Sequence, residues 1–297
     1  EIEMDDTRAI SWLASGLLSP VHGPMGSKDL TRVRKERRLE RGLLFDATPT
    51  LAVPPALADA PPPSAKLVPR GASMPIADVD VAEVFRDEET GATLLGGTLV
   101  SSSLPEAGVA RHTRARLDRL GATVVAGLFT ERALHRGDEY LCRVALETCD
   151  ALVVVIATAS PRHRRAVRAS LAAALSPERV IVIEMPDLPG ASDGGLEIAR
   201  AVVLRNAGAS IAIAREEDGA LARIAERGAK ELAVSVRPPV ATFSLPSGEL
   251  RTARTLPTGG KAEEISWPAL ARALERGERP SPRLMSPEAV TAFLAVD

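Results

Sequence analysis

The chain has 297 residues, of which 45% are hydrophobic, and a formal net charge of −2. This length suits two modest domains or one large one, and the nearly neutral charge excludes a global basic field that would recruit nucleic acid. No apolar run approaches the roughly 18 residues that a membrane span needs, and the acidic first residues lack the order of a signal peptide, so we expect a cytoplasmic protein.

Residues 1–110 are predicted to form a β-rich domain. Strand-like patches follow one another between residues 75 and 103, and EETG at 88–91 is typical of a hairpin turn. The stretch 48–70 is rich in proline, which lacks a backbone N–H and therefore favours edge strands, turns or ordered loops. The charged stretch 28–41, KDLTRVRKERRLER, is typical of a solvated helix, with a phosphate-binding arm as the alternative.

From residue 111 the sequence alternates between apolar runs and helical periodicity. The apolar runs, each expected to be a strand, are 122–128, 151–156, 179–185, 210–214 and 231–236. The segments expected to be helical are 111–121, 134–149, 161–176, 196–208 and 219–229. This alternation predicts an α/β domain over 111–236, with a doubly wound parallel sheet that binds ligands at the carboxyl ends of its strands. Residues 237–297 are predicted to be a small C-terminal subdomain, with a hairpin around PSGE and two closing helices.

The stretch 122–147 carries the strongest functional signal. A buried strand ends, a few residues turn, and a helix begins near His135. Backbone N–H groups at such a helix start favour an anion, often a phosphate. His135 and Asp138 are three residues apart, so we expect them on one helical face. Cys142 and Cys149 lie on the same predicted helix and imply no disulfide framework.

This stretch also resembles a known family. The segment 113–147, TRARLDRLGATVVAGLFTERALHRGDEYLCRVALE, resembles the core of ATP sulfurylase (sulfate adenylyltransferase), which has a Gln-Thr-Arg-Asn-Pro-type loop followed by His-x-x-His-Glu-Tyr. Further resemblances follow in the family's order: AISWLASGLLSPVHGPMG at 9–26, NAGASIAIAR at 206–215 and RALERGERPSPRLMSPEAVTAFL at 272–294. The resemblance therefore covers nearly the whole chain.

The resemblance implies a nucleotidyltransferase-like, Rossmann-type sheet, an N-terminal β-barrel of the pseudouridine-synthase-and-archaeosine-transglycosylase (PUA-like) type, and ATP as the nucleotide, with Mg as a further candidate. It also implies a homo-oligomer or a subunit of a partner, with an unidentified small-molecule acceptor and neither nucleic acid nor membrane. The implied catalytic residues are His135, Arg132 and Asp138. The implied nucleotide-binding residues are Thr130, Arg136, Arg215, Gly194, Gly195 and Ser266.

The loop departs from the family's pattern at most of its anion-binding positions. Phe129 stands at the Gln position, Glu131 at the Arg position, and Asp138 at the second His position. At roughly 4 Å and an effective dielectric near 20, each pair of unit charges is worth about 4 kcal/mol. A carboxylate in place of a guanidinium therefore opposes binding of a sulfate dianion. Arg132 could swing in to compensate, and Asp138 could hold a metal ion or a cationic acceptor.

Three functions remain open from the sequence. The chain could transfer an adenylyl group to an acceptor less anionic than sulfate, or it could be a catalytically inactive homologue that acts as a subunit or regulator. Competent sulfate adenylylation is the third, and it would require Arg132 and the basic cluster 162–165 to replace several lost groups. That basic cluster is more typical of a solvated helix start than of replacement cations.

Overall fold

The computed structural model describes residues 1–190, 196–214, 234–237, 242–256, 258–259 and 261–295. It consists of two compact units, each assembled from two stretches of chain. The first unit comprises Glu1–Arg116 and Met185–Ala207, and the second comprises Leu117–Glu184 and Gly208–Asp297. The predicted helix at 219–229 lies outside the described residues.

The first unit contains a five-stranded sheet. Its order is β1 (Ile2–Met4), β3 (Ser64–Pro69), β4 (Ala77–Arg86), β5 (Thr93–Ser102) and β2 (Leu51–Ala52). β1 pairs with β3 in parallel, and the other pairs are antiparallel. The turn between β4 and β5 contains EETG, where the Asp87 N–H donates to the Ala92 carbonyl and Gly91 has φ +70°. The predictions of a β-rich N-terminal region and of this hairpin turn are confirmed.

Helices and short turns complete the first unit. They are α1 (Arg8–Ser15), α2 (Ser27–Glu36), the 3₁₀ turn η1 (Pro55–Ala58), the start of α3 (Val109–Arg119), and α6 (Glu197–Asn206). The core of this unit packs Ile10 and Leu13 of α1 against Leu67, Val79 and Leu95 of the sheet. A small apolar core therefore joins α1 to the strands.

The second unit contains the parallel sheet that the alternating pattern predicts. Its order is β10 (Ser235–Arg237), β9 (Ile211–Ile213), β6 (Val125–Thr130), β7 (Ala151–Ala157) and β8 (Val180–Met185). β6 pairs in parallel with both β7 and β9, and β9 pairs in parallel with β10. All residues of β6 and β7 are buried, because strands in the middle of a parallel sheet are covered on both faces.

Two helices pack on one face of this sheet. α4 (Arg136–Leu146) contributes Cys142 and Ala145, and α5 (Pro161–Ala174) contributes Val167 and Leu171, to a core that includes alternate residues of β6 and β7. The 3₁₀ turn η2 (Pro177–Arg179) then leads into β8. The strand order reverses between β6 and β9, and in such sheets ligands bind beside that reversal at the carboxyl ends of the strands.

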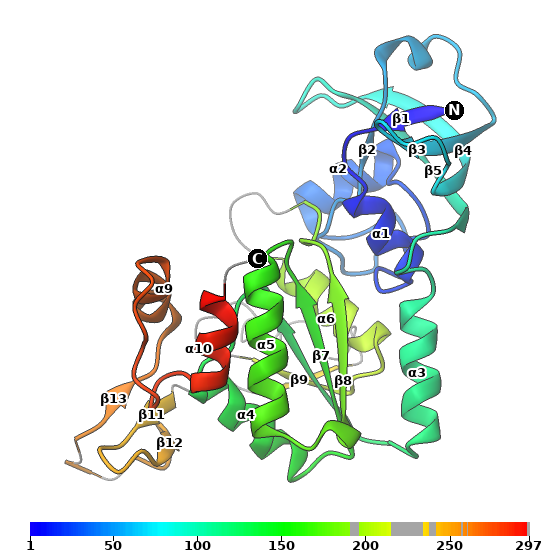
Figure 1. Cartoon of the computed structure of the whole chain (residues 1–297). Helices are drawn as coiled ribbons and strands as arrows, with labels where there is room; N and C mark the ends of the chain where they lie inside the picture. Colours follow the sequence, from blue (N-terminus) through cyan, green and yellow to red (C-terminus); the bar gives the residue numbers. More distant parts are fainter. Residues whose placement is uncertain (191–195, 215–233, 238–241, 257, 260, 296–297) are drawn as a thin grey trace. The chain divides into compact units, whose positions relative to one another are not determined.

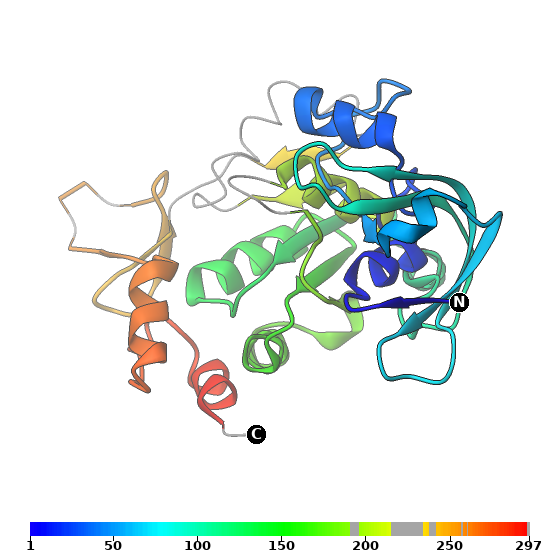
Figure 2. The same cartoon turned by 90° about the horizontal axis from the view of Figure 1, so that it is seen from above.

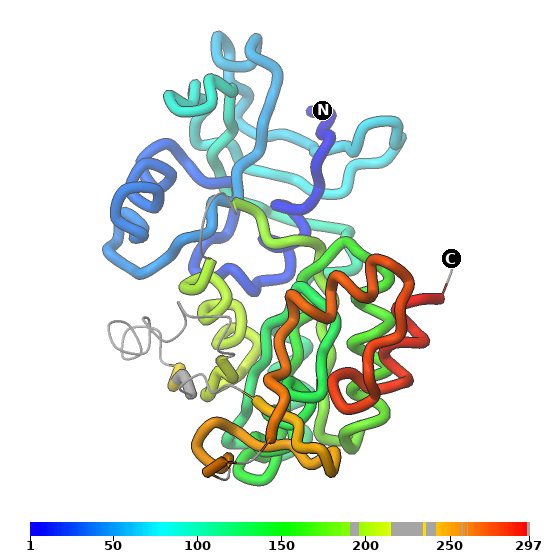
Figure 3. The backbone as a smooth tube through the Cα atoms, turned by 90° about the vertical axis from the view of Figure 1, so that its left-hand side faces the viewer, coloured from blue at the N-terminus to red at the C-terminus, as the bar shows by residue number. Residues whose placement is uncertain are grey.

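The C-terminal segment forms a hairpin and two helices, as predicted. The strands are β11 (Thr242–Ser244), β12 (Leu250–Thr252) and β13 (Glu263–Glu264), and the helices are α9 (Trp267–Glu275) and α10 (Pro287–Leu294). α10 lies beside α5 in Figures 1 and 2, and Figure 3 shows the orange and red segment running along the green part of the same unit. A second apolar core joins Ala133 and Ala166 to Leu270, Met285 and Phe293.

Candidate functional site

The site begins where β6 ends. The buried Thr130 hydroxyl donates to the Arg132 carbonyl at 2.7 Å and accepts from the Arg132 N–H at 3.3 Å. These two bonds close a tight turn at the carboxyl edge of the central strand. The turn places the loop Glu131–Leu134 next to the reversal of strand order, with Glu131 exposed and Ala133 and Leu134 buried. Thr130 thus shapes the loop that the sequence assigned to nucleotide binding.

His135 is the N-cap of α4, which confirms the predicted helix start. Its Nδ1 accepts from the Asp138 N–H at 3.1 Å, and its own N–H donates to Asp138 Oδ2 at 3.1 Å. This reciprocal pair is a capping box, here built with His and Asp. His135 is only 4% exposed and Asp138 is also buried. The first turn of α4 therefore obtains two of its hydrogen bonds from the protein's own side chains.

Arg132 is held inside the protein. Its guanidinium donates to Asp138 Oδ2 and to the Ala133 carbonyl, both at 3.0 Å, and lies 4.8 Å from the centre of the Trp267 ring. Its side chain is 11% exposed. A cation over an indole face and beside a carboxylate is stabilised on two sides. In this structure Arg132 neutralises Asp138 and is directed away from solvent.

The ring of His163 supports the same loop from α5. The Ala133 N–H donates to His163 Nδ1 at 2.8 Å, and the ring centre lies 5.7 Å from that of Trp267 and 5.1 Å from that of Phe293. Burial first, and then the positive charge of Arg132, lower the pKa of His163. From the sequence His163 was one residue of a basic cluster, and no spacing signal pairs it with Ala133 or with the distant Trp267.

Arg136 is the candidate cation that remains accessible at the start of α4. Its side chain is 36% exposed, and its Nη1 lies 2.8 Å from Oε2 of the buried Glu139. Glu139 also accepts from the Ser170 hydroxyl at 2.6 Å, so this carboxylate is fixed by α5. The Arg136 N–H donates to the Leu284 carbonyl at 2.8 Å. Arg136 is thus oriented by neighbours on two elements while its guanidinium reaches solvent.

The other residues assigned from the sequence are only partly placed. Ser266 is the N-cap of α9, directly before Trp267, and its hydroxyl makes no capping hydrogen bond. Gly194, Gly195 and Arg215 lie outside the described residues. Within the described ranges, no group of three or more His, Cys, Asp or Glu side chains could hold a metal ion, and no helix is long and apolar enough to cross a membrane.

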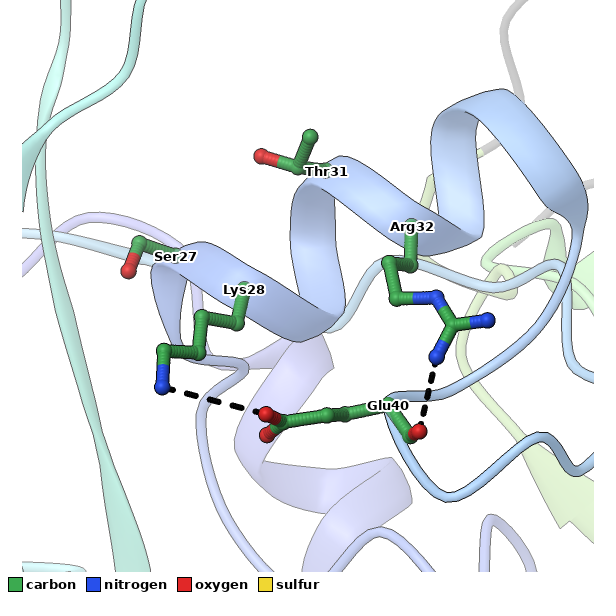
Figure 4. A pocket seen from close by; sticks show the side chains of 5 residues that line it. All are labelled: Ser27, Lys28, Thr31, Arg32 and Glu40. Atoms are coloured by element: carbon green, nitrogen blue, oxygen red, sulfur yellow. Dashed lines mark hydrogen bonds and ion pairs between the residues drawn. The ribbon is translucent and has the colours of Figure 1, made fainter.

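The basic helix α2 of the first unit borders a groove of about 460 Å³, shown in Figure 4. Lys28 Nζ lies 3.8 Å from Glu40 Oε1, and Arg32 Nη1 donates to the Glu40 carbonyl at 2.7 Å. Arg32 also pairs with Glu36 at 2.7 Å. Because both cations are engaged by neighbouring oxygens, the geometry favours the solvated helix over the phosphate-binding arm.

A second cavity of the first unit, of about 790 Å³, has a mixed charged lining. Each arginine that lines it has a carboxylate partner. The pairs are Arg8 with Asp6 at 2.6 Å, Arg34 with Asp87 at 2.6 Å, and Arg37 with Glu197 at 3.7 Å. The lining is therefore close to charge balance and does not select a strongly anionic ligand.

Comparisons with known proteins agree on one family. The ATP-sulfurylase family model matches residues 109–295. A "Probable bifunctional SAT/APS kinase 2" from Sorangium cellulosum is 26% identical over 97% of this chain and 58% of its own length. A "Sulfate adenylyltransferase" from Symbiobacterium thermophilum is 31% identical over 49% of this chain and 44% of its own length. The chain thus spans roughly half the length of the curated relatives it matches.

Among solved structures, the "Hexameric APS kinase from Thiobacillus denitrificans" is similar in fold, with a TM-score of 0.78 and 21% identity over 98% of this chain and 62% of that one. The family model covers the strand, loop and helix of the site and more than half of the chain. The chain therefore belongs to the ATP-sulfurylase family.

Proposed function

We propose that this chain is a nucleotide-binding member of the ATP-sulfurylase family that transfers an adenylyl group to an acceptor less anionic than sulfate. One observation carries the proposal: Arg132, a cation of the candidate loop, is largely buried against the Trp267 ring and neutralised by Asp138 at 3.0 Å. Because the guanidinium of Arg132 already pairs with the carboxylate of Asp138, little positive charge in the loop is left to bind a dianion. The exposed Glu131 at the same strand end disfavours a dianion further.

Nucleotide binding is supported by the place of the loop. It lies at the carboxyl end of the central strand, beside the reversal of strand order, where α/β sheets bind nucleotides. Arg136 is the described cation that would meet a phosphate there, and His135, as N-cap, would fix the position of the helix start. ATP is the nucleotide that the family implies; the residues described offer no carboxylate cluster for Mg.

A catalytically inactive homologue is the second candidate. It is favoured by the self-contained network at the start of α4, where His135 and Asp138 satisfy each other's backbone N–H groups. A helix terminus that is capped internally gains less from a bound phosphate than one that is open. The chain would then act as a subunit or regulator, using the family fold as a binding surface.

The finer features of the family are part of the same proposal. The first unit would be a PUA-like domain, the parallel sheet a doubly wound nucleotidyltransferase sheet, and the protein a cytoplasmic homo-oligomer or partner subunit. The hexamer named for the solved relative supports an oligomer. Gly194, Gly195, Arg215 and Ser266 would complete the nucleotide site.

A binding and turnover experiment separates these functions. Calorimetry with ATP should give measurable binding that Arg136→Gln weakens at least about tenfold, since a charged hydrogen bond is worth roughly 1.5–3 kcal/mol. Arg143→Gln, in the last turn of the same helix, is the matched control and should leave ATP affinity unchanged. Pyrophosphate release should appear with carboxylic acids or amines as acceptors and stay near background with sulfate.

Three results would contradict the proposal in different ways. Brisk pyrophosphate release with sulfate would restore sulfate adenylylation. ATP binding without turnover on any acceptor would favour the inactive homologue, and an absence of binding would remove the nucleotide site altogether.

A further inference from the structure

One backbone hydrogen bond of the candidate loop ends on a ring nitrogen of α5. The Ala133 N–H, in the middle of the loop, donates to Nδ1 of His163 at 2.8 Å. Ala133 is fully buried, so water cannot replace this acceptor without opening the loop. A ring nitrogen that accepts a hydrogen bond carries no proton, which places the proton of the neutral imidazole on Nε2.

The surroundings of the His163 ring disfavour a second proton. Trp267 of α9 and Phe293 of α10 pack on it at 5.7 and 5.1 Å between ring centres. The charged group that acts on the ring is Arg132, from the loop itself, and Arg132 also donates to Asp138 of α4. The remaining cations near the ring in sequence are its α5 neighbours Arg162, Arg164 and Arg165. Arg164 donates to the Thr158 carbonyl, and Arg165 to the carbonyls of Ala292 and Ala295.

Protonation of His163 would break this arrangement at two points. Nδ1 would become a donor, so the Ala133 N–H would lose its acceptor and two N–H groups would face each other. The new imidazolium would also stand beside Arg132, and like charges in a buried site repel strongly. The loop and the Arg132–Trp267 stack would then have to move, because neither group can be satisfied in place.

We propose that His163 is a positioning residue: its neutral ring holds the loop after β6 in the geometry seen here, and a proton on Nδ1 releases it. For its consequence on ligand binding the proposal rests on the proposed function, because the released loop is the candidate nucleotide site. The positioning itself needs no nucleotide. The claim that His163 positions the loop and the claim that the loop binds a nucleotide can therefore be tested separately.

The experiment reads the loop in the full chain without nucleotide. The chain has two tryptophans, Trp12 and Trp267, so its ¹⁵N spectrum contains two indole signals, and Trp267→Phe assigns them. As the pH falls from 8, the Trp267 indole signal and the Ala133 amide signal should titrate together, with a midpoint below the 6.5 of an ordinary histidine. The Trp12 indole signal should stay in place.

Substitutions at position 163 separate positioning from bulk. In His163→Asn the side-chain carbonyl replaces Nδ1 as acceptor, so both signals should keep their high-pH positions throughout the titration. In His163→Phe the ring remains but the acceptor is lost, so hydrogen exchange of the Ala133 amide, corrected for intrinsic rate, should quicken at least tenfold at pH 7.5. His112→Asn, at an exposed histidine, is the matched control and should titrate like the wild-type chain.

The proposal is overturned if the two signals do not move over the whole pH range in which the chain stays folded, or if they move identically in His163→Asn. Unchanged protection of the Ala133 amide in His163→Phe would overturn it as well. If ATP binds, its dissociation constant should rise more steeply as the pH falls in the wild-type chain than in His163→Asn, which gives the baseline set by the protonation of ATP itself. If ATP does not bind at any pH, the proposed function fails while the titration still decides the role of His163.

Discussion

Gly137 lies in the first turn of α4, and the lack of a side chain there lets Thr242 of β11 come close. A Cβ at position 137 would overlap the Thr242 hydroxyl and lie 2.9 Å from its Cβ. Gly137 also sits one residue before the capping carboxylate of Asp138. A glycine at this point thus allows the C-terminal hairpin to pack against the start of the helix that carries the candidate site.

Replacement of Gly137 by Ala should lower the free energy of unfolding by about 1–3 kcal/mol, the usual cost of overpacking. Urea unfolding of the wild-type chain and of Gly137→Ala measures this. Thr242→Ala should recover part of the loss in the double variant, because it removes the hydroxyl that the new methyl meets. Equal stability of Gly137→Ala and the wild-type chain would show that the hairpin can move away freely.

At this scale, the sequence predicts what is local. The start of α4 at His135 follows from apolar spacing and needs no distant partner. The role of Arg132 does not follow from local spacing. From the sequence, Arg132 was expected to be able to turn toward a ligand. Its guanidinium instead lies over Trp267, a residue 135 positions later in the chain. Ion-pair and stacking partners at such separations leave no periodic trace in a single sequence.

The N-terminus of α6 is capped by a residue from another part of the first unit. Its own N-cap, Leu196, has no side-chain acceptor, and Asp46 supplies one instead, accepting from the N–H groups of Ile198 at 3.0 Å and Ala199 at 2.6 Å. A carboxylate at a helix N-terminus is favourable. Burial nevertheless dominates and raises the pKa of Asp46 to about 6.

Because the folded-state pKa of Asp46 lies above its ordinary value of 3.8, the folded protein binds this proton more tightly than the unfolded chain. The contribution of Asp46 to stability is therefore complete below about pH 4 and is lost as the pH rises through about 6. The wild-type chain should lose stability relative to Asp46→Asn over this window. Urea unfolding at pH 4, 5, 6 and 7 gives the difference.

Asp46→Asn keeps an acceptor, so Asp46→Ala should be less stable than Asp46→Asn by about 0.5–2 kcal/mol at every pH, as expected for removal of a helix cap. A stability difference between the wild-type chain and Asp46→Asn that does not change from pH 4 to 7 would contradict the assignment.

The strands and helices of the second unit were predictable because each is a local apolar or amphipathic run. The cap of α6 by Asp46 was not predictable, because Asp46 and Ile198 are far apart in the sequence and meet only after folding.

The first unit is built from two stretches separated by most of the parallel sheet. Met185–Ala207 supplies the carbonyls of Pro186 and Asp187, which accept from the Trp12 indole at 3.2 and 3.1 Å. It also supplies Asn206, whose amide donates to the Leu17 and Ser19 carbonyls. The composition of residues 185–207 does not indicate that this segment belongs to the first unit, because it resembles any other segment between two strands.

A fragment of residues 1–116 should therefore fold incompletely. Without the second stretch the Trp12 indole loses its acceptors, and its fluorescence should shift toward the red of an exposed tryptophan. The same fragment joined through a flexible Gly/Ser linker to residues 185–207 is the control, and it should regain blue-shifted emission and a cooperative urea transition. Native-like emission from the shorter fragment would mean that Met185–Ala207 is dispensable for this core.

The discontinuous unit also sets an order of events during synthesis. When residues 1–116 have left the ribosome, the segment Met185–Ala207, which completes the fold of the first unit, has not yet been released. At roughly 5–20 residues per second, the wait lasts several seconds. During this wait the nascent N-terminal portion exposes an apolar surface while the parallel strands emerge behind it. Nascent chains that stall after release of Arg116 and before release of Ala207 should therefore depend most on chaperones.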